Sequence, residues 1–203
     1  MLFRSESYAA ERKAAAIENI CVTARTSRFL APQSTFERRL RKGLLELAHD
    51  YPFARALVNT GRLSLPNQYP LSQFVKEGGG SALSNFTLRD STGAATGLSD
   101  VLSGLGLACL GLYLPRPGFD PVRAAISGIG GDGLPYTVRT LDIGQGASHC
   151  ALADSGGYLQ RATGVSAGDL IIIRPDLYCA GVLRSPSAAD VERSLAAVTA
   201  FGA

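Results

Sequence analysis

Two glycine-rich motifs have the residue types and spacing of known chemistry. Residues 164–168 read G-V-S-A-G, the pattern of a nucleophile elbow, in which a serine on a strand-to-helix turn attacks a carbonyl carbon. The motif leads into the apolar run 170–173, which predicts a strand, so the order of the elements is reversed. The histidines that could act as a general base are His49 and His149. We expect a plain glycine turn rather than a hydrolase site.

The second motif, G-I-G-G-D-G at residues 128–133, is similar to a phosphate-binding loop. A dinucleotide-binding loop joins a strand to the N-terminus of a helix, because the helix amide groups must face the pyrophosphate. This segment instead follows an expected helix at 120–127 and precedes Pro135 and an expected strand at 137–141. It is therefore interpreted as a helix-to-strand connection.

The cysteines lie too far apart for a C-x-x-C redox pair or a zinc site, since the closest two are 29 residues apart. They are Cys21, Cys109, Cys150 and Cys179. Asp142 and Asp154 flank His149, but these residues do not have the spacing that makes a metal site specific. We expect buried free thiols and no metal.

A cluster of basic residues lies at positions 38–42. It consists of Arg38, Arg39, Arg41 and Lys42. On a helix, positions 38, 41 and 42 share a face opposite an apolar stripe, which is typical of a solvated face rather than of a nucleic-acid contact. If this segment packs on a partner domain, the arginines become candidates for interdomain ion pairs.

One charged turn is also notable. Arg174, Pro175 and Asp176 lie between two β-branched or apolar runs. A proline-fixed turn with a local arginine–aspartate pair is the favoured interpretation, and any further role of Arg174 and Asp176 is left open.

Composition describes an ordinary globular chain. It has 203 residues, 46% hydrophobic and 18% charged, with a formal charge of +3. That charge is too small for a field that attracts nucleic acid or an anionic membrane. We find no signal-peptide pattern in residues 1–12 and no long apolar run, so we expect a cytoplasmic protein, in which the sequon at 85–87 has no meaning.

The two ends of the chain differ in charge and in glycine. Residues 1–62 carry 11 basic and 6 acidic residues and two of the 23 glycines, whereas the remainder carries 9 basic and 11 acidic residues. Glycine favours turns, so this shift predicts a helical segment at 1–61 and a turn-rich α/β domain at 62–203.

Hydrophobic periodicity supports this division. Positions 17, 20, 21 and 24 share one helical face, and Ser34 with Glu37 forms a capping-box pattern ahead of a second helix. Pro52 allows a third helix at 53–59, ended by Gly61. The later part alternates strands and helices. We expect strands at 86–88, 107–114, 137–141, 150–153, 171–173 and 178–183, and helices at 99–103, 120–127 and after a cap by Ser187 and Asp190.

These residues, in order, resemble FAD-dependent aromatic-ring hydroxylases of the phenol hydroxylase and 3-(3-hydroxyphenyl)propionate hydroxylase type. The segments 8–12, 18–20, 25–29 and 59–64, with Pro66 and Tyr69, are similar to the end of their catalytic part. The segments 88–90 and 170–176, with Gly93, Asp154, Gly157 and Tyr178, are similar to their C-terminal domain. Leu177 stands where the family commonly has glycine or a polar residue.

The resemblance implies a mixed α/β fold class, with an N-terminal helical segment followed by a thioredoxin-like α/β domain without redox cysteines. In the family this domain serves packing and often dimerisation. FAD and NAD(P)H are implied as cofactors, but the chain begins after the positions of the family's three flavin motifs. We therefore assign no catalytic, cofactor or metal residue and expect neither cofactor to bind this chain alone. The expected partner is an FAD-binding domain, in cis or as a separate chain, and a homodimer is the other arrangement considered.

Three functions stay open. The first is the C-terminal piece of a flavoprotein monooxygenase, inactive alone, with exposed apolar surface on its first two helices. The second is an independent binding or assembly module that has no enzymatic activity. The third is a thiol-dependent redox enzyme that uses Cys150 or Cys179, which would need a lowered thiol pKa and solvent access.

Overall fold

The computed structural model divides the chain into two compact units, Tyr8–Asn67 and Gln68–Ala203, the second of which also includes Met1–Ser7. The structure describes residues 2–58, 65–72, 75–106, 108–116, 121–129, 134, 136–143 and 151–199, without the side chains of 2–8, 10 and 199. The division falls after residue 67, whereas the sequence places the domain boundary at 61. Residues 59–64 lie outside the described part, and the two domains of the resemblance stay a prediction.

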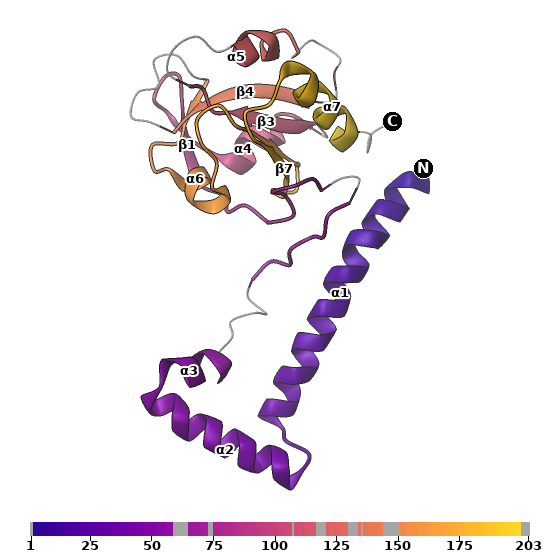
Figure 1. Ribbon diagram of the computed structural model, residues 1–203, viewed down its shortest axis with the longest axis vertical. Helices are drawn as coiled ribbons and strands as arrows, with labels where there is room; N and C mark the ends of the chain where they lie inside the picture. Colours follow the sequence, from indigo (N-terminus) through magenta and orange to yellow (C-terminus); the bar gives the residue numbers. More distant parts are fainter. Residues whose placement is uncertain are drawn as a thin grey trace. The chain divides into compact units, whose positions relative to one another are not determined.

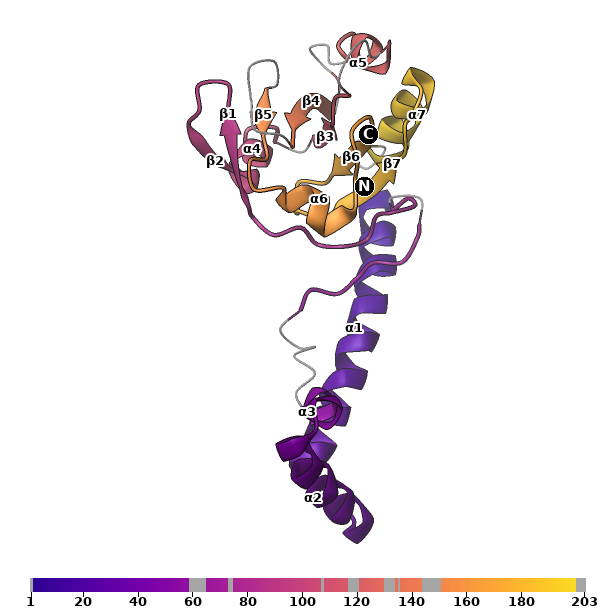
Figure 2. The ribbon, with the colours of Figure 1, turned by 60° about the vertical axis from the view of Figure 1, so that its left-hand side comes forward.

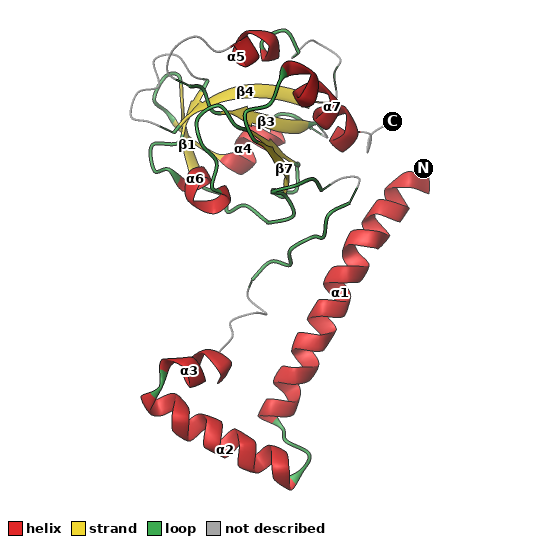
Figure 3. Ribbon diagram, in the orientation of Figure 1, coloured by secondary structure: helices red, strands yellow, loops and turns green. Residues whose placement is uncertain are grey.

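The first unit is helical. It contains α1 (Leu2–Leu30), α2 (Thr35–Asp50) and α3 (Pro52–Val58), drawn in red in Figure 3. The predicted capping box is confirmed, because Glu37 N donates to Ser34 Oγ at 3.1 Å and Ser34 N donates to Glu37 Oε2 at 3.2 Å. This exchange satisfies amide groups that the first turn of a helix leaves unpaired.

Local hydrogen bonds join these helices to one another. Arg28 of α1 forms an ion pair with Glu37 of α2. Arg55 of α3 donates to the carbonyl oxygens of Ala48 and His49 at 3.1 and 3.0 Å, and so satisfies the C-terminal end of α2. Asn67 donates to Glu18 Oε2 at 2.8 Å, which ties the segment after α3 to α1. The unit is therefore held largely by polar contacts near helix ends.

The second unit is built on a seven-stranded mixed sheet of order β2-β1-β5-β4-β3-β6-β7, seen in Figure 2. The strands are β1 (Thr87–Asp90), β2 (Ala95–Gly97), β3 (Cys109–Tyr113), β4 (Tyr136–Asp142), β5 (Leu152–Ala153), β6 (Leu170–Ile173) and β7 (Cys179–Leu183). β4 is parallel to both β3 and β5, and the other pairs are antiparallel.

The helices of this unit cover the sheet. They are α4 (Leu98–Ser103), α5 (Pro121–Ile126), α6 (Tyr158–Thr163) and α7 (Ala188–Thr199). Figure 1 shows α5 and α7 on one side of β3 and β4 and α4 on the other. Two buried clusters result, one around Leu112 and Ile171 and one around Ile172 and Leu195. Ile171 and Ile172 belong to different clusters because successive side chains of a strand point to opposite faces of the sheet.

The parallel β3-α5-β4 crossover, followed by the antiparallel β6-β7 hairpin and α7, is the thioredoxin-like arrangement that the resemblance implies. The mixed α/β fold class is thereby confirmed. The predicted β6-β7 hairpin is confirmed as well, with a register shift at Ile172 and Ile173. Ser187 and Asp190 cap α7 as predicted, since Asp190 N donates to Ser187 Oγ at 3.3 Å and Ser187 N donates to Asp190 Oδ2 at 3.1 Å.

The described residues of both glycine-rich motifs lie in turns. Residues 164–168 form the turn between α6 and β6, with Gly164 and Gly168 at φ angles of +66° and +92°, so the motif is the plain turn that was expected. Of the second motif, residues 128 and 129 continue in a turn after α5, and 130–133 lie outside the described residues.

The edge of β7 is covered by the chain that enters this unit. Lys76 N donates to Ala180 O at 2.7 Å, and Gly80 N donates to Cys179 O at 2.8 Å. Gly80 has a φ of +95°, and a Cβ there would lie 2.2 Å from Tyr69 O, so only glycine fits this close approach. Pairing with another strand at this edge is blocked, because these backbone groups are already bonded.

Candidate functional site

Two thiols of the α/β unit lie in the described part of the chain, and neither has the properties of a reactive centre. Cys109 and Cys179 are buried, and burial raises the pKa of each thiol to about 11. Since the thiolate is the nucleophile, a high thiol pKa opposes catalysis, and Cys179 does not fit the redox role considered for it. Cys150, the other candidate, lies outside the described residues, and Cys21 is exposed on α1.

The Arg174–Asp176 turn is confirmed as a local ion pair. Arg174 donates to both carboxylate oxygens of Asp176, at 3.2 Å from Nε and 2.8 Å from Nη2. Tyr69 stacks on Tyr178 with ring centroids 4.3 Å apart, and the Arg174 guanidinium lies 5.8 Å from the Tyr69 ring centroid. Leu177 takes a φ of +64°, a conformation that favours glycine. These contacts describe a rigid turn.

Two buried aspartates are bound to backbone amides. Asp154 accepts from Tyr158 N at 3.0 Å and from Leu159 N at 2.9 Å, so it caps α6 rather than binding a metal with His149. Asp169 accepts from Ser166 N at 2.9 Å and from Arg184 at 2.6 Å. Burial opposes ionisation of Asp169, but these bonds outweigh it and hold its pKa below the usual value.

The residues that carry the resemblance in this unit therefore build turns. Asp90 accepts from Thr92 N at 2.8 Å and Ala94 N at 3.0 Å, and Gly93 has a φ of +84° in the same hairpin. Gly157, with a φ of +60°, precedes α6. The backbone conformation or capping bond at each of these positions explains its residue type. These residues therefore indicate a shared fold and do not indicate a catalytic function.

The helical unit carries a hollowed surface whose charged and apolar side chains are not covered by the rest of the unit. A groove of about 440 Å³ runs between α1 and α2, and we call it the α1–α2 groove. It is lined by Cys21, Arg25, Arg28, Phe29, Glu37, Leu40 and Arg41. Cys21, Arg25, Arg28 and Phe29 come from α1 at helical spacing, and the others come from the first two turns of α2.

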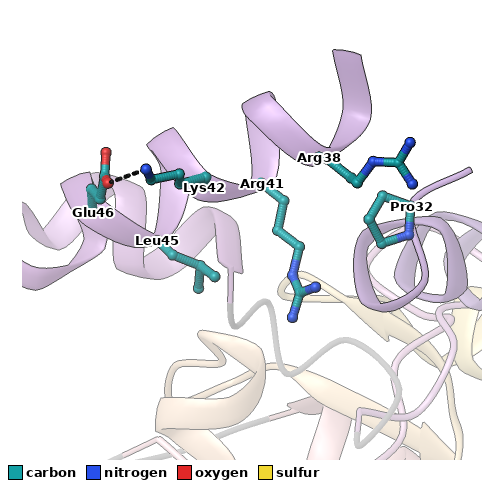
Figure 4. Close-up of a pocket in the computed structure, with 6 residues that line it drawn as sticks. All are labelled: Pro32, Arg38, Arg41, Lys42, Leu45 and Glu46. Carbon is teal, nitrogen blue, oxygen red and sulfur yellow. Dashed lines mark ion pairs between the residues drawn. The ribbon is translucent and has the colours of Figure 1, made fainter. Parts of the chain in front are cut away.

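A second hollow of about 470 Å³, the outer hollow, adjoins it at Arg41. It is lined by Pro32, Arg38, Arg41, Lys42, Leu45 and Glu46. Figure 4 shows Lys42 turned along α2 toward Glu46, Arg38 extending toward Pro32, and Arg41 projecting away from α2 between them. Lys42 Nζ lies 3.8 Å from Glu46 Oε1, an exposed pair that contributes little to stability.

Most cations of this surface have no carboxylate partner. Among the residues that the structure describes, Arg25, Arg38, Arg39 and Arg41 form no ion pair. The nearby carboxylate of Glu37 is occupied, because Gln33 N, Arg28 and Ser34 N all donate to it and lower its pKa. The Nε atom of Arg41 is buried and has no hydrogen-bond acceptor. The fully solvated face expected from the sequence is thus wrong for Arg41.

Apolar side chains accompany these cations. α2 buries none of its residues, and Phe36 and Leu40 are 73% and 51% exposed. On α1, Ile17 and Ile20 are exposed as well. The exposed apolar surface expected on the first two helices is confirmed. Exposed apolar patches on a protein often mark a site of interaction with another molecule or domain.

Other classes of site find no support in the described part of the chain. No cluster of three potential metal ligands occurs among the described residues. Within the same residues, no helix combines the length and hydropathy that a membrane span requires.

Comparison with known proteins places the fold among large flavin enzymes. Neither a family model nor a curated protein matches the sequence. The similar solved structures include the OxyS anhydrotetracycline hydroxylase from Streptomyces rimosus (TM-score 0.58, 18% identity), aklavinone-11 hydroxylase in complex with FAD and aklavinone (0.55, 16%), and the flavin-dependent monooxygenase PieE in complex with FAD and substrate (0.53, 17%). The similarity covers 95%, 97% and 96% of this chain but only 34%, 35% and 39% of those chains. At such identity the likeness shows a shared fold, that of the C-terminal portion of these hydroxylases.

Proposed function

We propose that this chain is the C-terminal portion of an FAD-dependent, NAD(P)H-using aromatic-ring hydroxylase and has a structural role, inactive alone. The observation that carries the proposal is the extent of the likeness, which includes both the helices and the α/β unit of this chain and about a third of each hydroxylase. The order of the resembling segments along the sequence supports it independently.

The turn between β5 and α6 does not fit the pyrophosphate of FAD. Gly156 and Gly157 lie between β5 and α6, where a phosphate-binding turn would be sought. The amide groups of Tyr158 and Leu159 at the start of α6 already donate to the Asp154 carboxylate, whose negative charge would repel a phosphate. We therefore assign flavin and nicotinamide binding to the remaining portion of the enzyme and no step of the reaction to this chain.

The role left to this chain is packing. The α/β unit has a closed core on both faces of its sheet, whereas the helical unit presents unpaired arginines beside exposed apolar side chains. A flavin enzyme needs a dry, ordered pocket around its cofactor, and a rigid domain docked on the catalytic portion helps to supply that order.

The proposal is tested by spectroscopy and reconstitution. The purified chain, incubated with FAD and dialysed, should retain no stoichiometric flavin absorbance. The DNA immediately upstream of the Met1 codon should encode the G-x-G-x-x-G and later Gly-Asp flavin motifs, in the same frame or as a separate chain. Co-expression of the two parts should give NAD(P)H-dependent hydroxylation. Stoichiometric flavin on the isolated chain, or upstream DNA without these motifs, would refute the proposal.

A stand-alone assembly module is the second candidate, because the α/β unit buries its own core and covers its β7 edge. A monodisperse, cooperatively melting dimer of the isolated chain would favour this candidate.

A further inference from the structure

We propose that the α1–α2 groove is the seat for a segment of the flavin-binding portion in which an apolar anchor side chain is flanked by carboxylates. The inference rests on the proposed function and goes beyond it, because it names the contact surface and the chemistry of the segment that occupies it. The groove lies wholly within the helical unit, so its lining is defined by α1 and α2 alone.

The lining of the groove is suited to an apolar anchor. Phe29 and Leu40 present carbon surface from the two helices, and Cys21 adds a small apolar group beside them. Leu40 is half exposed although it belongs to the apolar stripe of an amphipathic helix. An apolar side chain placed between two helices is the usual way in which a groove binds an amphipathic segment.

The rim of the groove requires negative charge. Arg25 and Arg41 line it from opposite helices, and neither has an ion-pair partner among the described residues. The buried Nε of Arg41 lacks a hydrogen-bond acceptor, which is unfavourable for a polar group. A carboxylate from the bound segment would form a charge-assisted pair with the guanidinium of Arg41 or Arg25.

The charge distribution disfavours a second copy of this chain as the occupant. Residues 1–62 carry 11 basic and 6 acidic residues, so two helical segments brought together at this groove would repel each other. The covered β7 edge also offers no strand for pairing between copies at that position. An acidic segment of a different polypeptide region satisfies the same cations without this repulsion.

Cys21 provides a direct test, because it lies in the groove and is exposed, whereas Cys109 and Cys179 are buried. The experiment uses the full chain with Cys150→Ser, alone and assembled with the flavin-binding polypeptide encoded upstream of the Met1 codon. The rate of maleimide labelling at Cys21 is read by mass spectrometry. We expect assembly to slow this rate about tenfold or more, as burial of a site restricts reagent access.

Charge variants supply the second arm. Arg25→Glu and Arg41→Glu should each weaken assembly about tenfold or more, and rising salt should weaken assembly of the parent chain. Arg39→Glu is the matched control, since Arg39 lies on α2 but lines neither hollow, and it should change affinity less than about threefold. Arg41→Gln, which removes the charge and keeps a donor, should be intermediate, and circular dichroism verifies that each variant keeps its helices.

The outcomes separate the two proposals. If no complex forms with the parent chain, the proposed function is overturned together with this inference. If a complex forms while Cys21 labels at the free rate, or while both glutamate variants bind as tightly as Arg39→Glu, the groove is not the seat and only this inference is overturned. Protection of Cys21 together with loss of binding in the two variants supports it.

Discussion

The α/β unit and the helical unit are held together by different forces. In the α/β unit, β3 and β6 are fully buried, and their side chains enter the two clusters that face α4 on one side and α7 on the other. In the helical unit, α2 buries no residue and is positioned by a capping box, an ion pair to Arg28 and the carbonyl contacts of Arg55. A unit stabilised by its own core can fold alone, whereas one held by helix-end contacts keeps its apolar face available to a partner.

Thiol accessibility should show the largest difference between the units. In a Cys150→Ser background under native conditions, Cys21 should react with a maleimide rapidly, and Cys109 and Cys179 about a thousandfold more slowly, because they react only after local or global opening. Their raised thiol pKa of about 11 lowers the thiolate fraction further at neutral pH. Mass spectrometry after timed quenching gives the rates. Equal rates for Cys21 and Cys179 would contradict the burial on which this comparison depends.

Truncation of a leucine side chain to alanine should lower the free energy of unfolding much more in the α/β unit than in the helical unit. Leu112→Ala in β3 removes a fully buried side chain and should reduce the free energy of unfolding by about 2–5 kcal/mol, measured by urea denaturation. Leu40→Ala on α2 is the matched variant, and it should change that free energy by no more than about 0.5 kcal/mol, because Leu40 is half exposed. A similar loss for both variants would mean that the helical unit has a core of its own.

A buried charge should have a smaller, pH-dependent effect. Asp169→Asn removes the partner of Arg184 and should reduce the free energy of unfolding by about 1–3 kcal/mol at neutral pH. The folded-state pKa of Asp169 lies below its unfolded value of about 3.9. Its stabilisation is therefore complete above about pH 4 and is lost as the pH falls through the folded pKa.

The difference between the parent chain and Asp169→Asn should consequently shrink when urea titrations are repeated at low pH. Asp176→Asn, at the more exposed turn, serves as the control and should cost less than about 1 kcal/mol. A difference that is constant from neutral to acid pH would show that the ionised carboxylate of Asp169 is not what stabilises this turn.

Loss of the α2 cap should have the smallest effect. Ser34→Ala removes the acceptor of Glu37 N and should cost about 1 kcal/mol, seen as reduced helical circular dichroism at moderate temperature. Ser34→Asp should retain the helicity, since aspartate also caps a helix. The unfolding of the α/β unit should be unchanged in both variants, and a shift there would indicate that the two units unfold together.

Local sequence patterns determined much of this fold. The capping boxes at Ser34 and Ser187 marked the starts of α2 and α7, because a side-chain oxygen three residues before an acidic residue satisfies free helix amides. The apolar run 170–173, the Pro175 turn and the following run predicted the β6-β7 hairpin. The turn nature of residues 164–168 was predicted from the absence of the strand-turn-helix order that a nucleophile elbow requires.

Other features were decided by tertiary contacts. β2 has only three residues, too short for a period to be recognised, and it exists because β1 supplies its hydrogen bonds. α6 has six residues and begins where the Asp154 carboxylate accepts from its first amide groups. β5 lies within the strand expected at 150–153, but only its pairing with β1 and β4 limits it to two residues. The contacts of Asp169 with Arg184 and Ser185 carried no signal in the sequence, because these partners lie 15 and 16 residues further along the chain. The Arg38 to Lys42 cluster was visible as a basic run, but its solvated interpretation missed Arg41, which is partly buried.

The α1–α2 groove shows the same division most clearly. The sequence by itself determined that α1 and α2 are helices, that each has an apolar stripe and that arginines accompany them, since these properties depend on the spacing of neighbouring residues. Only the tertiary structure brought Cys21, Arg25 and Phe29 beside Leu40 and Arg41 and left the Nε of Arg41 without an acceptor. The turn between the two helices sets that juxtaposition, and the geometry of a turn is not encoded in the period of the helices that it joins.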